Sequence, residues 1–557
     1  MLRLTELRLP LDHPEDALRG AVLRRLGVGG ADLLGVSVAR RGYDARKPAA
    51  INLVYTLDLE LRDEAAVLRR HAGDPRIGPA PDTRYRLVAR APEPAGPPRP
   101  VVVGAGPCGL MAALVLAQMG FRPLVIERGQ PVRQRTKDTW GLWRRGVLQP
   151  ESNVQFGEGG AGTFSDGKLY SQIRDPRHLG RKVLEEFVRA GAPEEILWVS
   201  KPHIGTFRLV TVVEGMRAEI ERLGGEYRFG ARVVDFDVEE GADGTRRLRG
   251  LVLEDGETIE ATHAVLAPGH SARDLFAALL RRGVAMEAKP FSIGVRIEHP
   301  QRIIDRARFG PNAGNKLLGA ADYRLAHHCA NGRAVYSFCM CPGGRVVAAT
   351  SEPGHVVTNG MSQYSRAEFN ANAGIVVGIS PADYPGGVLA GVEFQRRWER
   401  AAFEAGGGDY RAPAQRVGDF LAGRPSTSLG EVVPSYQPGT RPADLSACLP
   451  EYAVAAMREA LPAFARQVPG FAMGDAVMTG VETRTSSPIR LPRDARFQSA
   501  NTEGLFPAGE GAGYAGGILS AGVDGVRVAE AVAMALTGRE VPPEWSRRRS
   551  EAALVYG

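Results

Sequence analysis

The sequence predicts an α/β fold in which a parallel-sheet domain is interrupted by an inserted, mixed α+β region and follows a small α+β domain. A glycine-rich turn between an apolar strand and an apolar helix opens the parallel-sheet domain at residues 101–127. A second glycine-rich loop leads into a long apolar helix at residues 504–538, and the proline-rich linker "APEPAGPPRP" occupies residues 91–100. We therefore predict four segments, of which the second and fourth form one domain: 1–95, 100–284, 285–480 and 481–540.

The composition is that of an ordinary globular protein. The chain has 557 residues, of which 44% are hydrophobic and 24% charged, and its formal net charge of +7 is mild for this length. Five cysteines scattered over a long chain argue against a secreted disulfide framework, and the amino terminus lacks the apolar core of a signal peptide. We expect a cytoplasmic protein without a membrane-spanning segment.

Residues 1–95 show the order β-α-β-β-α-β, which is typical of a ferredoxin-like domain. Apolar periodicity predicts strands at 2–11, 32–41, 50–61 and 83–90, and helices at 14–27 and 63–73. The stretch "ARRGYDARK" raises nucleic-acid binding as an alternative role for this domain, with these residues around Tyr43: Arg40, Arg41, Arg46 and Lys47. The small net charge does not favour a nucleic-acid partner, so this role is our second choice.

The segment "RPVVVGAGPCGLMAALVLAQMGFRPLVIERG" carries the pattern G-x-G-x-x-G between a buried strand and an apolar helix. A second strand follows and ends in an acidic residue, which completes a Rossmann-like turn for FAD or NAD(P). The glycines let the backbone approach a pyrophosphate, the helix N-terminus attracts the phosphates, and the acidic residue accepts hydrogen bonds from ribose hydroxyls. The predicted cofactor-binding residues are Gly104, Gly106, Pro107, Gly109 and Glu127.

The loop "GLFPAGEGAGYAGGILSAG" repeats the glycine pattern at Gly511, Gly513 and Gly516. A second nucleotide-binding unit would need a further strand and acidic residue. After Gly538 only nineteen residues remain, and their prolines discourage a strand. We therefore expect the late loop to reach the same dinucleotide as the early turn.

This late loop resembles the carboxy-terminal flavin loop of the FAD oxidoreductases with two dinucleotide-binding domains. The resemblance implies that FAD is the cofactor, held noncovalently, and that Gly509 and Glu510 form the pair whose carboxylate accepts a ribityl hydroxyl. It also implies that the last helix opens against the flavin, where its partial positive charge stabilises the reduced ring. The other positions that it implies are Gly516, Gly517 and Ile518, Ala267 and Gly269 in "ATHAVLAPGH", and Val233 in "ARVVDFDV".

Two longer blocks, at residues 150–169 and 335–377, look like a family of bacterial, mostly uncharacterised FAD-dependent dehydrogenases with a small amino-terminal domain. The resemblance runs from about residue 101 to residue 538 and implies an oxidoreductase without a settled substrate. The first block, "PESNVQFGEGGAGTFSDGKL", is a glycine-rich loop that can lie flat against a planar ligand; a polar surface loop is the alternative. Its cofactor candidates are Gly160, Gly162, Thr163 and Lys168, and the phosphate candidates nearby are Arg128 and Arg135.

The second block contains "SFCMCPGG", which places Cys339 and Cys341 two residues apart. In a regular strand both thiols would face one side, which makes them candidates for a redox pair beside the flavin. A structural place in the core is the alternative, since cysteine is often buried. His327, His328 and Cys329 lie nearby in the sequence but lack the spacing of a zinc site, so we predict no metal.

Two further residues are candidates for catalysis. His270 directly follows Gly269 and is a candidate acid or base, although a satisfied surface histidine is an equal alternative. Arg484 in "VETRTSSPIR" is a candidate for binding a substrate carboxylate with two parallel hydrogen bonds.

These features predict an FAD-dependent oxidoreductase that transfers hydride between an unknown small substrate and a noncovalent flavin, in a cleft beside the inserted region. The expected partners are a small-molecule substrate and a soluble electron donor or acceptor, and the sequence leaves the oligomeric state open. One alternative is an RNA-modifying flavoenzyme that binds RNA with its amino-terminal domain. The other is a non-catalytic binding protein on the same fold.

Overall fold

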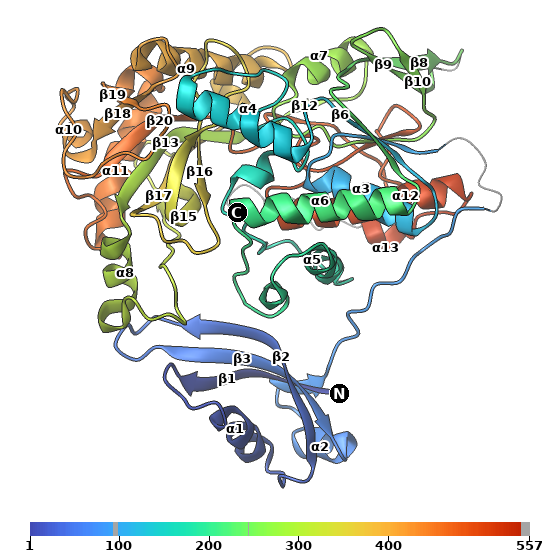
Figure 1. Cartoon of the computed structure of the whole chain (residues 1–557), viewed down its shortest axis with the longest axis vertical. Coiled ribbons are helices and arrows are strands. Elements are labelled where there is room, and N and C mark those ends of the chain that lie inside the picture. Colours follow the sequence, from blue (N-terminus) through green and yellow to red (C-terminus); the bar gives the residue numbers. More distant parts are fainter. Residues whose placement is uncertain (93–98, 243, 547–557) are drawn as a thin grey trace.

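The computed structural model describes residues 1–92, 99–242 and 244–546, and the chain has the predicted α/β character (Figure 1). The amino-terminal domain lies at the bottom of the view, the parallel-sheet domain on the right, and the inserted sheet at the upper left. Residues 93–98 of the predicted linker, which include the expected domain boundary, lie outside the described residues.

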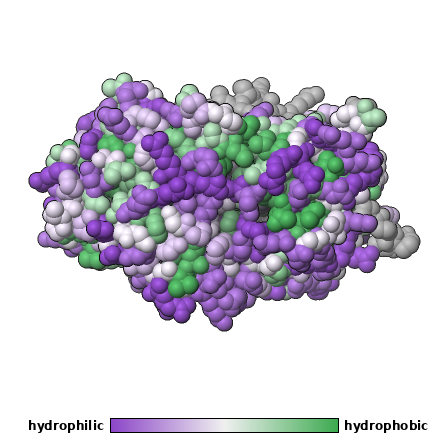
Figure 2. Space-filling model, turned by 90° about the horizontal axis from the view of Figure 1, so that it is seen from above, coloured by the Kyte–Doolittle hydropathy of each residue, from purple (hydrophilic) through white to green (hydrophobic). Residues whose placement is uncertain are grey.

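The surface is largely hydrophilic when the molecule is viewed from above, and apolar residues gather there in a few patches (Figure 2). Over the described ranges, no helix combines the length and the apolar character that crossing a bilayer requires.

The amino-terminal domain is a four-stranded antiparallel sheet with two helices, in the strand order β2-β3-β1-β4. Its elements are β1 (Leu2–Pro10), α1 (Ala17–Leu26), β2 (Leu33–Asp44), β3 (Asn52–Leu61), α2 (Glu64–Arg70) and β4 (Ile77–Pro79). The prediction of a strand at residues 83–90 is wrong, because β4 lies earlier and occupies the edge beside β1. The 83–90 segment runs instead to the parallel-sheet domain, where Tyr85 Oη donates to the Glu530 carboxylate at 3.1 Å.

The parallel sheet has five strands in the order β22-β11-β5-β6-β7. They are β5 (Val101–Val103), β6 (Leu124–Glu127), β7 (Glu226–Phe229), β11 (Ala264–Leu266) and β22 (Leu505–Pro507). The edge strand β22 comes from the carboxy-terminal part of the chain and pairs with β11. The sheet therefore joins the two separated segments into one Rossmann-like domain.

Both faces of the parallel sheet are covered, because its side chains alternate between two layers. Val102, Val125 and Val265 face a helical layer of α3 (Pro107–Gln118), α5 (Leu179–Arg189), α6 (Thr206–Arg222) and α12 (Ile518–Leu536). Val103 and Ile126 face the opposite layer, which consists of β8 (Val233–Glu240), β9 (Arg246–Leu253), β10 (Thr258–Glu260) and α7 (Arg273–Arg281).

The inserted region forms an eight-stranded sheet in the order β14-β15-β17-β13-β20-β18-β19, with β16 paired to β15. Its strands are β13 (Phe291–Pro300), β14 (Ala326–His328), β15 (Ala334–Ala348), β16 (Thr358–Ser362), β17 (Asn370–Ile379), β18 (Ala412–Arg416), β19 (Thr440–Pro442) and β20 (Val477–Glu482). Its helices are α8 (Gln301–Phe309), α9 (Ala390–Gly406), α10 (Val417–Leu421) and α11 (Glu451–Gln467).

Several shorter contacts connect the domains. Where the chain enters and leaves the inserted region, β12 (Glu287–Ala288) pairs with β21 (Ile489–Arg490). Helix α4 (Val132–Arg145) reaches the inserted sheet, where Trp143 Nε1 donates to Ala348 O at 2.9 Å. A last short helix, α13 (Pro543–Ser546), follows α12.

The amino-terminal domain docks through the edge of β2. Arg41 N donates to Trp198 O at 2.6 Å, Ser200 N donates to Arg41 O at 2.8 Å, and the Arg41 guanidinium lies 4.6 Å from the centre of the Trp198 ring. Tyr43 packs edge-on against Phe309 of α8, so the domain also contacts the inserted region. Two residues of the basic stretch are thus engaged inside the molecule.

Candidate functional site

One large cavity lies between the parallel-sheet domain and the inserted region. Its volume is about 2150 Å³, whereas typical ligand pockets measure roughly 300–1,000 Å³, so it has room for a large cofactor and a further ligand. The carboxyl ends of β5, β6, β11 and β22 meet at this cavity, which is the edge of an α/β sheet where ligands bind. Residues of β13 and β15 line it from the inserted sheet.

The early glycine turn lies in the cavity wall. Gly104 has φ +98°, and a Cβ there would lie 2.3 Å from Ala267 O. A Cβ at Gly109 would lie 1.8 Å from Gly104 O, so neither position accepts a side chain without movement of the backbone. Gly106 and Pro107 line the cavity at the N-terminus of α3, whose unpaired N–H groups are available to phosphates.

Glu127 ends β6 and lines the cavity, but its carboxylate binds the backbone. It accepts hydrogen bonds from the N–H groups of Ala105 at 2.8 Å, and of Gly129 and Gly157 at 2.9 Å. It therefore ties the early turn to the glycine-rich loop at 150–169. The ribose contact expected of this carboxylate stays a prediction.

Arg128 lines the cavity, yet carboxylates already occupy its guanidinium. It donates to Glu151 at 2.7 Å and to Asp274 at 2.9 Å, and it lies 4.0 Å from the centre of the Phe156 ring. A phosphate would have to compete with two anionic partners for its hydrogen bonds, so its role as a phosphate ligand stays a prediction.

The predictions for Arg135 and Thr163 need correction, because neither residue lines the cavity. Arg135 is fully buried and donates to the carbonyl oxygens of Asn153, Val154 and Glu158 at 2.7–2.8 Å. It therefore braces the glycine-rich loop from behind, and burial lowers its pKa to about 10. Thr163 is buried inside the same loop. The other predicted members of this loop, Gly160, Gly162 and Lys168, do line the cavity.

The late glycine loop opens into the same cavity. Helix α12 packs along α3, which brings the two ends of the Rossmann-like domain together. Gly509 N donates to Asp524 Oδ2 at 2.8 Å, and Asp524 forms a buried ion pair with Arg493 at 2.6 Å, which holds the start of the loop. The predicted cofactor residues that line the cavity here and in the adjacent segments are Gly509, Glu510, Gly516, Gly517, Ile518, Val233, Ala267 and Gly269.

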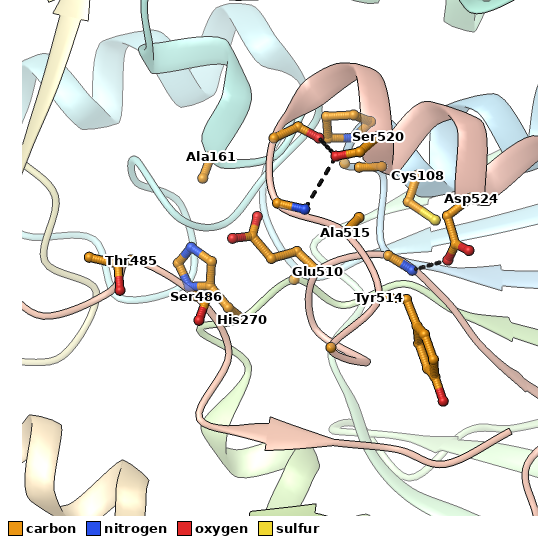
Figure 3. A pocket seen from close by; sticks show the side chains of 18 of the residues that line it. Cys108, Ala161, His270, Thr485, Ser486, Glu510, Tyr514, Ala515, Ser520 and Asp524 are labelled. Atoms are coloured by element: carbon orange, nitrogen blue, oxygen red, sulfur yellow. Dashed lines mark hydrogen bonds between the residues drawn. The ribbon is translucent and has the colours of Figure 1, made fainter. Parts of the chain in front are cut away.

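Glu510 and His270 reach into the cavity from the loops that follow β22 and β11 (Figure 3). Burial raises the pKa of Glu510 to about 7, although the Lys289 ammonium acts in the opposite direction. Burial, and next the positive charge of Arg484, lowers the pKa of His270 to about 3. The His270 ring is therefore neutral at neutral pH, with Nδ1 3.0 Å from Ser271 Oγ. Glu510 can exchange a proton near neutral pH, whereas His270 offers a neutral imidazole.

The prediction for Arg484 also needs correction. Arg484 lines the cavity, but its Nε and Nη2 donate to the Glu399 carboxylate at 3.1 and 3.0 Å, and its Nη1 donates to Ser351 at 2.6 Å. Arg273 binds the same carboxylate at 2.7 and 3.0 Å, so two buried arginines share Glu399. Because Glu399 takes the pair of donors that a substrate carboxylate would need, Arg484 supports the cavity wall.

Cys339 lines the cavity, and Cys341 does not. The pairing of β15 is irregular between Phe338 and Cys341, and Cys339 adopts a left-handed backbone with φ +42°. The prediction that both thiols face one side as in a regular strand is therefore wrong. The two cysteines are still in contact, since the fully buried Cys341 thiol donates to the Cys339 carbonyl oxygen at 3.3 Å.

Sequence reasoning missed a buried polar cluster beneath Cys339. Arg296 of β13 donates to both carboxylate oxygens of Glu482 at 2.8 and 3.0 Å, to Asn359 at 3.0 Å, and to Cys339 O at 2.8 Å. These residues come from four separate strands, and no motif connects them. Because β13 and β20 are buried on both faces, their sequences carry no alternation that would indicate a polar face.

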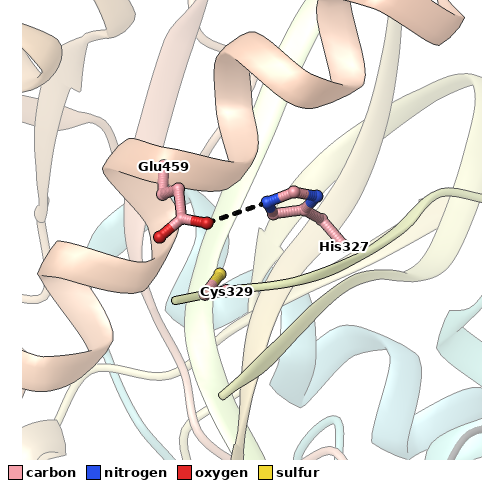
Figure 4. Close-up of side chains that lie close together, drawn as sticks. All are labelled: His327, Cys329 and Glu459. Carbon is pink, nitrogen blue, oxygen red and sulfur yellow. Dashed lines mark hydrogen bonds and ion pairs between the residues drawn. The ribbon is translucent and has the colours of Figure 1, made fainter. Parts of the chain in front are cut away.

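A group of metal-binding residue types lies outside the cavity, between β14 and α11 (Figure 4). Ligand atoms of His327, Cys329 and Glu459 all lie within 4.8 Å of one another. Each has a partner in the protein: His327 Nε2 lies 3.0 Å from Glu459 Oε1, Cys329 Sγ donates to Ala456 O at 3.4 Å, and Glu459 accepts from Ala330 N. These contacts link the edge strand to the helix.

Two stretches of the chain match family models of flavin proteins. Residues 290–485 match a family described as FAD-dependent protein, C-terminal domain-like, and residues 100–141 match an FAD binding domain. Residues 1–60 match a domain of unknown function. The cofactor is FAD, and the two glycine loops, the helix N-terminus and the cavity volume fit a dinucleotide of this kind.

Similar proteins extend this comparison. A protein of Clostridium beijerinckii, described as uncharacterized, is 46% identical over 531 residues, which cover 95% of this chain and 98% of that protein. A D-amino-acid oxidase of Rubrobacter xylanophilus is 33% identical over 180 residues, or 30% of this chain and 48% of the oxidase. The crystal structure of a flavoprotein/dehydrogenase from Cytophaga hutchinsonii is 12% identical, with a TM-score of 0.35 and coverage of 80% of this chain and 81% of that one. A structural similarity this low carries no argument about activity.

Proposed function

The chain belongs to the family of FAD-dependent proteins that includes the Clostridium beijerinckii relative, and we propose that it is an oxidoreductase that transfers hydride between a small substrate and noncovalent FAD. The observation that carries this proposal is the shared cavity. Both glycine loops open into it, and its remaining walls carry titratable side chains and leave space for a second ligand. FAD supplies the two-electron chemistry when it is bound.

In this proposal, residues of the chain bind FAD and orient it. The N-terminus of α3, between Gly106 and Pro107, would hold the phosphates, and the Glu510 carboxylate would accept a ribityl hydroxyl. The N-terminus of α12, at Gly517 and Ile518, would face the flavin ring, where its dipole favours negative charge. Glu127 would turn from its backbone partners to the ribose.

The candidates for proton transfer are groups whose pKa values are shifted by burial in the cavity. Glu510 changes its protonation state near neutral pH, and neutral His270 can donate or accept a hydrogen bond with a substrate. Burial lowers the pKa of Lys289, which lies on the same cavity wall, although the charge of Glu510 opposes this. These three residues are the candidates for proton handling. A small substrate would bind beside them, and a soluble electron donor or acceptor would complete the reaction by exchanging electrons with the flavin.

We infer the finer domain roles from the same geometry. The inserted region, predicted at 285–480, would serve as the substrate domain, because β13 and β15 form the cavity wall away from the glycine loops. The amino-terminal domain would be ferredoxin-like, because β3 lies between β1 and β2 and pairs antiparallel with both, as in a split β-α-β unit.

The two alternatives predict different outcomes. An RNA-modifying flavoenzyme would need a free basic surface on the amino-terminal domain, but Arg41 stacks on Trp198 and Tyr43 packs against Phe309. A non-catalytic binding protein would have no use for FAD chemistry, and its flavin would stay oxidised with every substrate.

The experiment is an anaerobic screen of the purified holoprotein. We expect the protein to show flavin absorbance as isolated and to lose the oxidised flavin band with one class of small donors, NADPH included among the candidates. Bleaching by one class only would support an oxidoreductase and name its substrate. A yellow protein that dithionite bleaches but no donor does would favour the binding protein, and a colourless protein that stays colourless with added FAD would contradict the proposal.

A further inference from the structure

The sulfur atoms of Cys339 and Cys341 form a pair at the cavity wall. Cys339 is at the surface of the cavity, in a backbone conformation that non-glycine residues seldom adopt, and Cys341 is buried directly behind it. Cys341 Sγ donates to Cys339 O at 3.3 Å, so the two cysteines are in direct contact. Cys339 is thus at the cavity, and Cys341 contacts it from the buried side.

Two cations act on the exposed sulfur. Lys168 projects from the glycine-rich loop and lines the same cavity, and the guanidinium of Arg296 donates to Cys339 O at 2.8 Å from the buried side. The interaction with the Cys341 side chain lowers the pKa of Cys339 well below its usual value; burial opposes this, and Lys168 and Arg296 add to it. These contacts favour the thiolate form of Cys339, which is the reactive form of cysteine.

Residues of the glycine-rich loops that are expected to hold the cofactor line the same cavity as Cys339. Lys168 belongs to the loop that also contributes Gly160 and Gly162 to the cavity. Glu510 of the late loop lines the same cavity as Cys339, and its pKa is raised first by burial and further by the negative charge of Cys339. Cys108, Cys329 and Cys448, in contrast, are buried thiols whose pKa values burial raises.

We propose that Cys339 and Cys341 are a redox pair that exchanges two electrons with the bound FAD, and that the pair serves a thiol or disulfide substrate that reaches Cys339 through the cavity. This inference rests on the proposed oxidoreductase function and names its substrate class. It assigns Cys339 to contact with the substrate and Cys341 to the resolving role.

The electrons and protons balance without a further reagent. The Cys339 thiolate and the Cys341 thiol form one S–S bond and lose two electrons and one proton. Oxidised FAD takes up both electrons and that proton and becomes the anionic reduced form. In the reverse direction, a disulfide substrate would be reduced by exchange at Cys339 through a mixed disulfide, which the Cys341 sulfur then resolves.

The test counts electrons and thiols in the holoprotein. The oxidised protein is titrated anaerobically with dithionite, and Cys339→Ser, Cys341→Ser and Cys448→Ser are compared with it. Cys448 is the matched control, because it is fully buried in the inserted region and lies outside the cavity. A second sample is alkylated in denaturant before and after reduction, and the labelled cysteines are counted by mass. This second readout needs no variant.

We expect the wild type and Cys448→Ser to take up two two-electron equivalents per FAD, and the other two variants to take up one. We also expect the oxidised wild type to carry two fewer labelled cysteines than the reduced protein. A wild type that takes up one equivalent and labels equally in both states would overturn the redox pair and leave the flavin enzyme intact. A protein without flavin absorbance before titration would overturn the proposed function, and the redox pair with it.

Discussion

At the scale of single residues, burial sets the chemistry of the side chains that face the cavity. Glu510 and His270 are an ordinary acid and base in the sequence, and the cavity moves the pKa of one to about 7 and of the other to about 3. Both shifts favour the neutral form, as expected where water is excluded. An oxidoreductase that moves hydride and proton together can use such groups.

Glu510→Gln tests the role of this carboxyl in holding the cofactor. An ionised carboxylate accepts a stronger hydrogen bond than a neutral one, so FAD binding favours loss of the Glu510 proton. Because the pKa is raised to about 7, the wild type is mostly protonated at about pH 6 and mostly ionised at about pH 8. We expect its FAD dissociation constant to fall up to about tenfold over this range, which is one pKa unit of free energy. The variant should show no such fall, and fluorescence titration at both pH values decides. Parallel curves for the two proteins would mean that Glu510 does not contact the cofactor.

Predictability from sequence differs between glycines and arginines. Gly104 and Gly109 are predictable, because the requirement for no side chain is local and repeats in a fixed pattern. Arg135 and Arg484 are not, because a guanidinium has five donors and any acceptor that tertiary structure supplies can occupy them. Carbonyl oxygens occupy those of Arg135, and Glu399 and two serines occupy those of Arg484. Sequence reasoning placed both near the cofactor, and only their contacts reveal that they are supports.

At the scale of elements, two predictions from the sequence are wrong for local reasons. The pair Cys339 and Cys341 breaks the two-residue alternation, because β15 is irregular and its backbone turns left-handed at Cys339. The 83–90 segment alternates as a strand would, but the sheet edge beside β1 is already filled by β4. A sequence pattern records which face a residue prefers and not whether a pairing edge is free.

Gly109→Ala tests the close contact between the early turn and α3. The added Cβ would lie 1.8 Å from Gly104 O, so the helix must shift away from the strand. Overpacking of this kind costs about 1–3 kcal/mol, and the shift also opens the phosphate site. We expect a melting temperature several degrees lower and weaker FAD binding. Gly474→Ala is the control, because a Cβ there meets nothing within 4 Å. Equal melting temperatures for the two variants would contradict the packing argument.

At the scale of the whole molecule, segments far apart in the sequence build one site. The late loop reaches the early turn because β22 joins the parallel sheet beside β11 and α12 packs along α3. The sequence predicts this meeting, since the late glycine loop resembles a flavin loop that returns to the cofactor of the early turn. The polar cluster around Arg296 was beyond sequence reasoning, because its partners come from strands that only the folded sheet brings together.

The docked amino-terminal domain predicts that the protein does not bind RNA. Arg41 stacks on Trp198, and Arg46 pairs with Asp44 at 2.8 Å, so two of the four cations of the basic stretch already have partners. Fluorescence anisotropy of a labelled single-stranded RNA at low salt should stay unchanged on addition of the protein, although low salt favours phosphate contacts. Salt-sensitive binding that an Arg40→Ala/Lys47→Ala double variant abolishes would restore the RNA-modifying alternative.

The central claim, that both loops hold one FAD, is tested most directly by the stoichiometry of FAD binding to the apoprotein in a calorimeter. Gly106 has φ −76° and a Cβ there would lie 3.7 Å from Gly160 Cα, while a Cβ at Gly516 meets nothing within 4 Å, so the fold can accept Gly106→Ala and Gly516→Ala. Both residues line the cavity. We predict one FAD per wild-type chain, and at least about tenfold weaker binding in each variant, which corresponds to about 1.4 kcal/mol. Two FAD molecules per chain, or full affinity in either variant, would contradict the account.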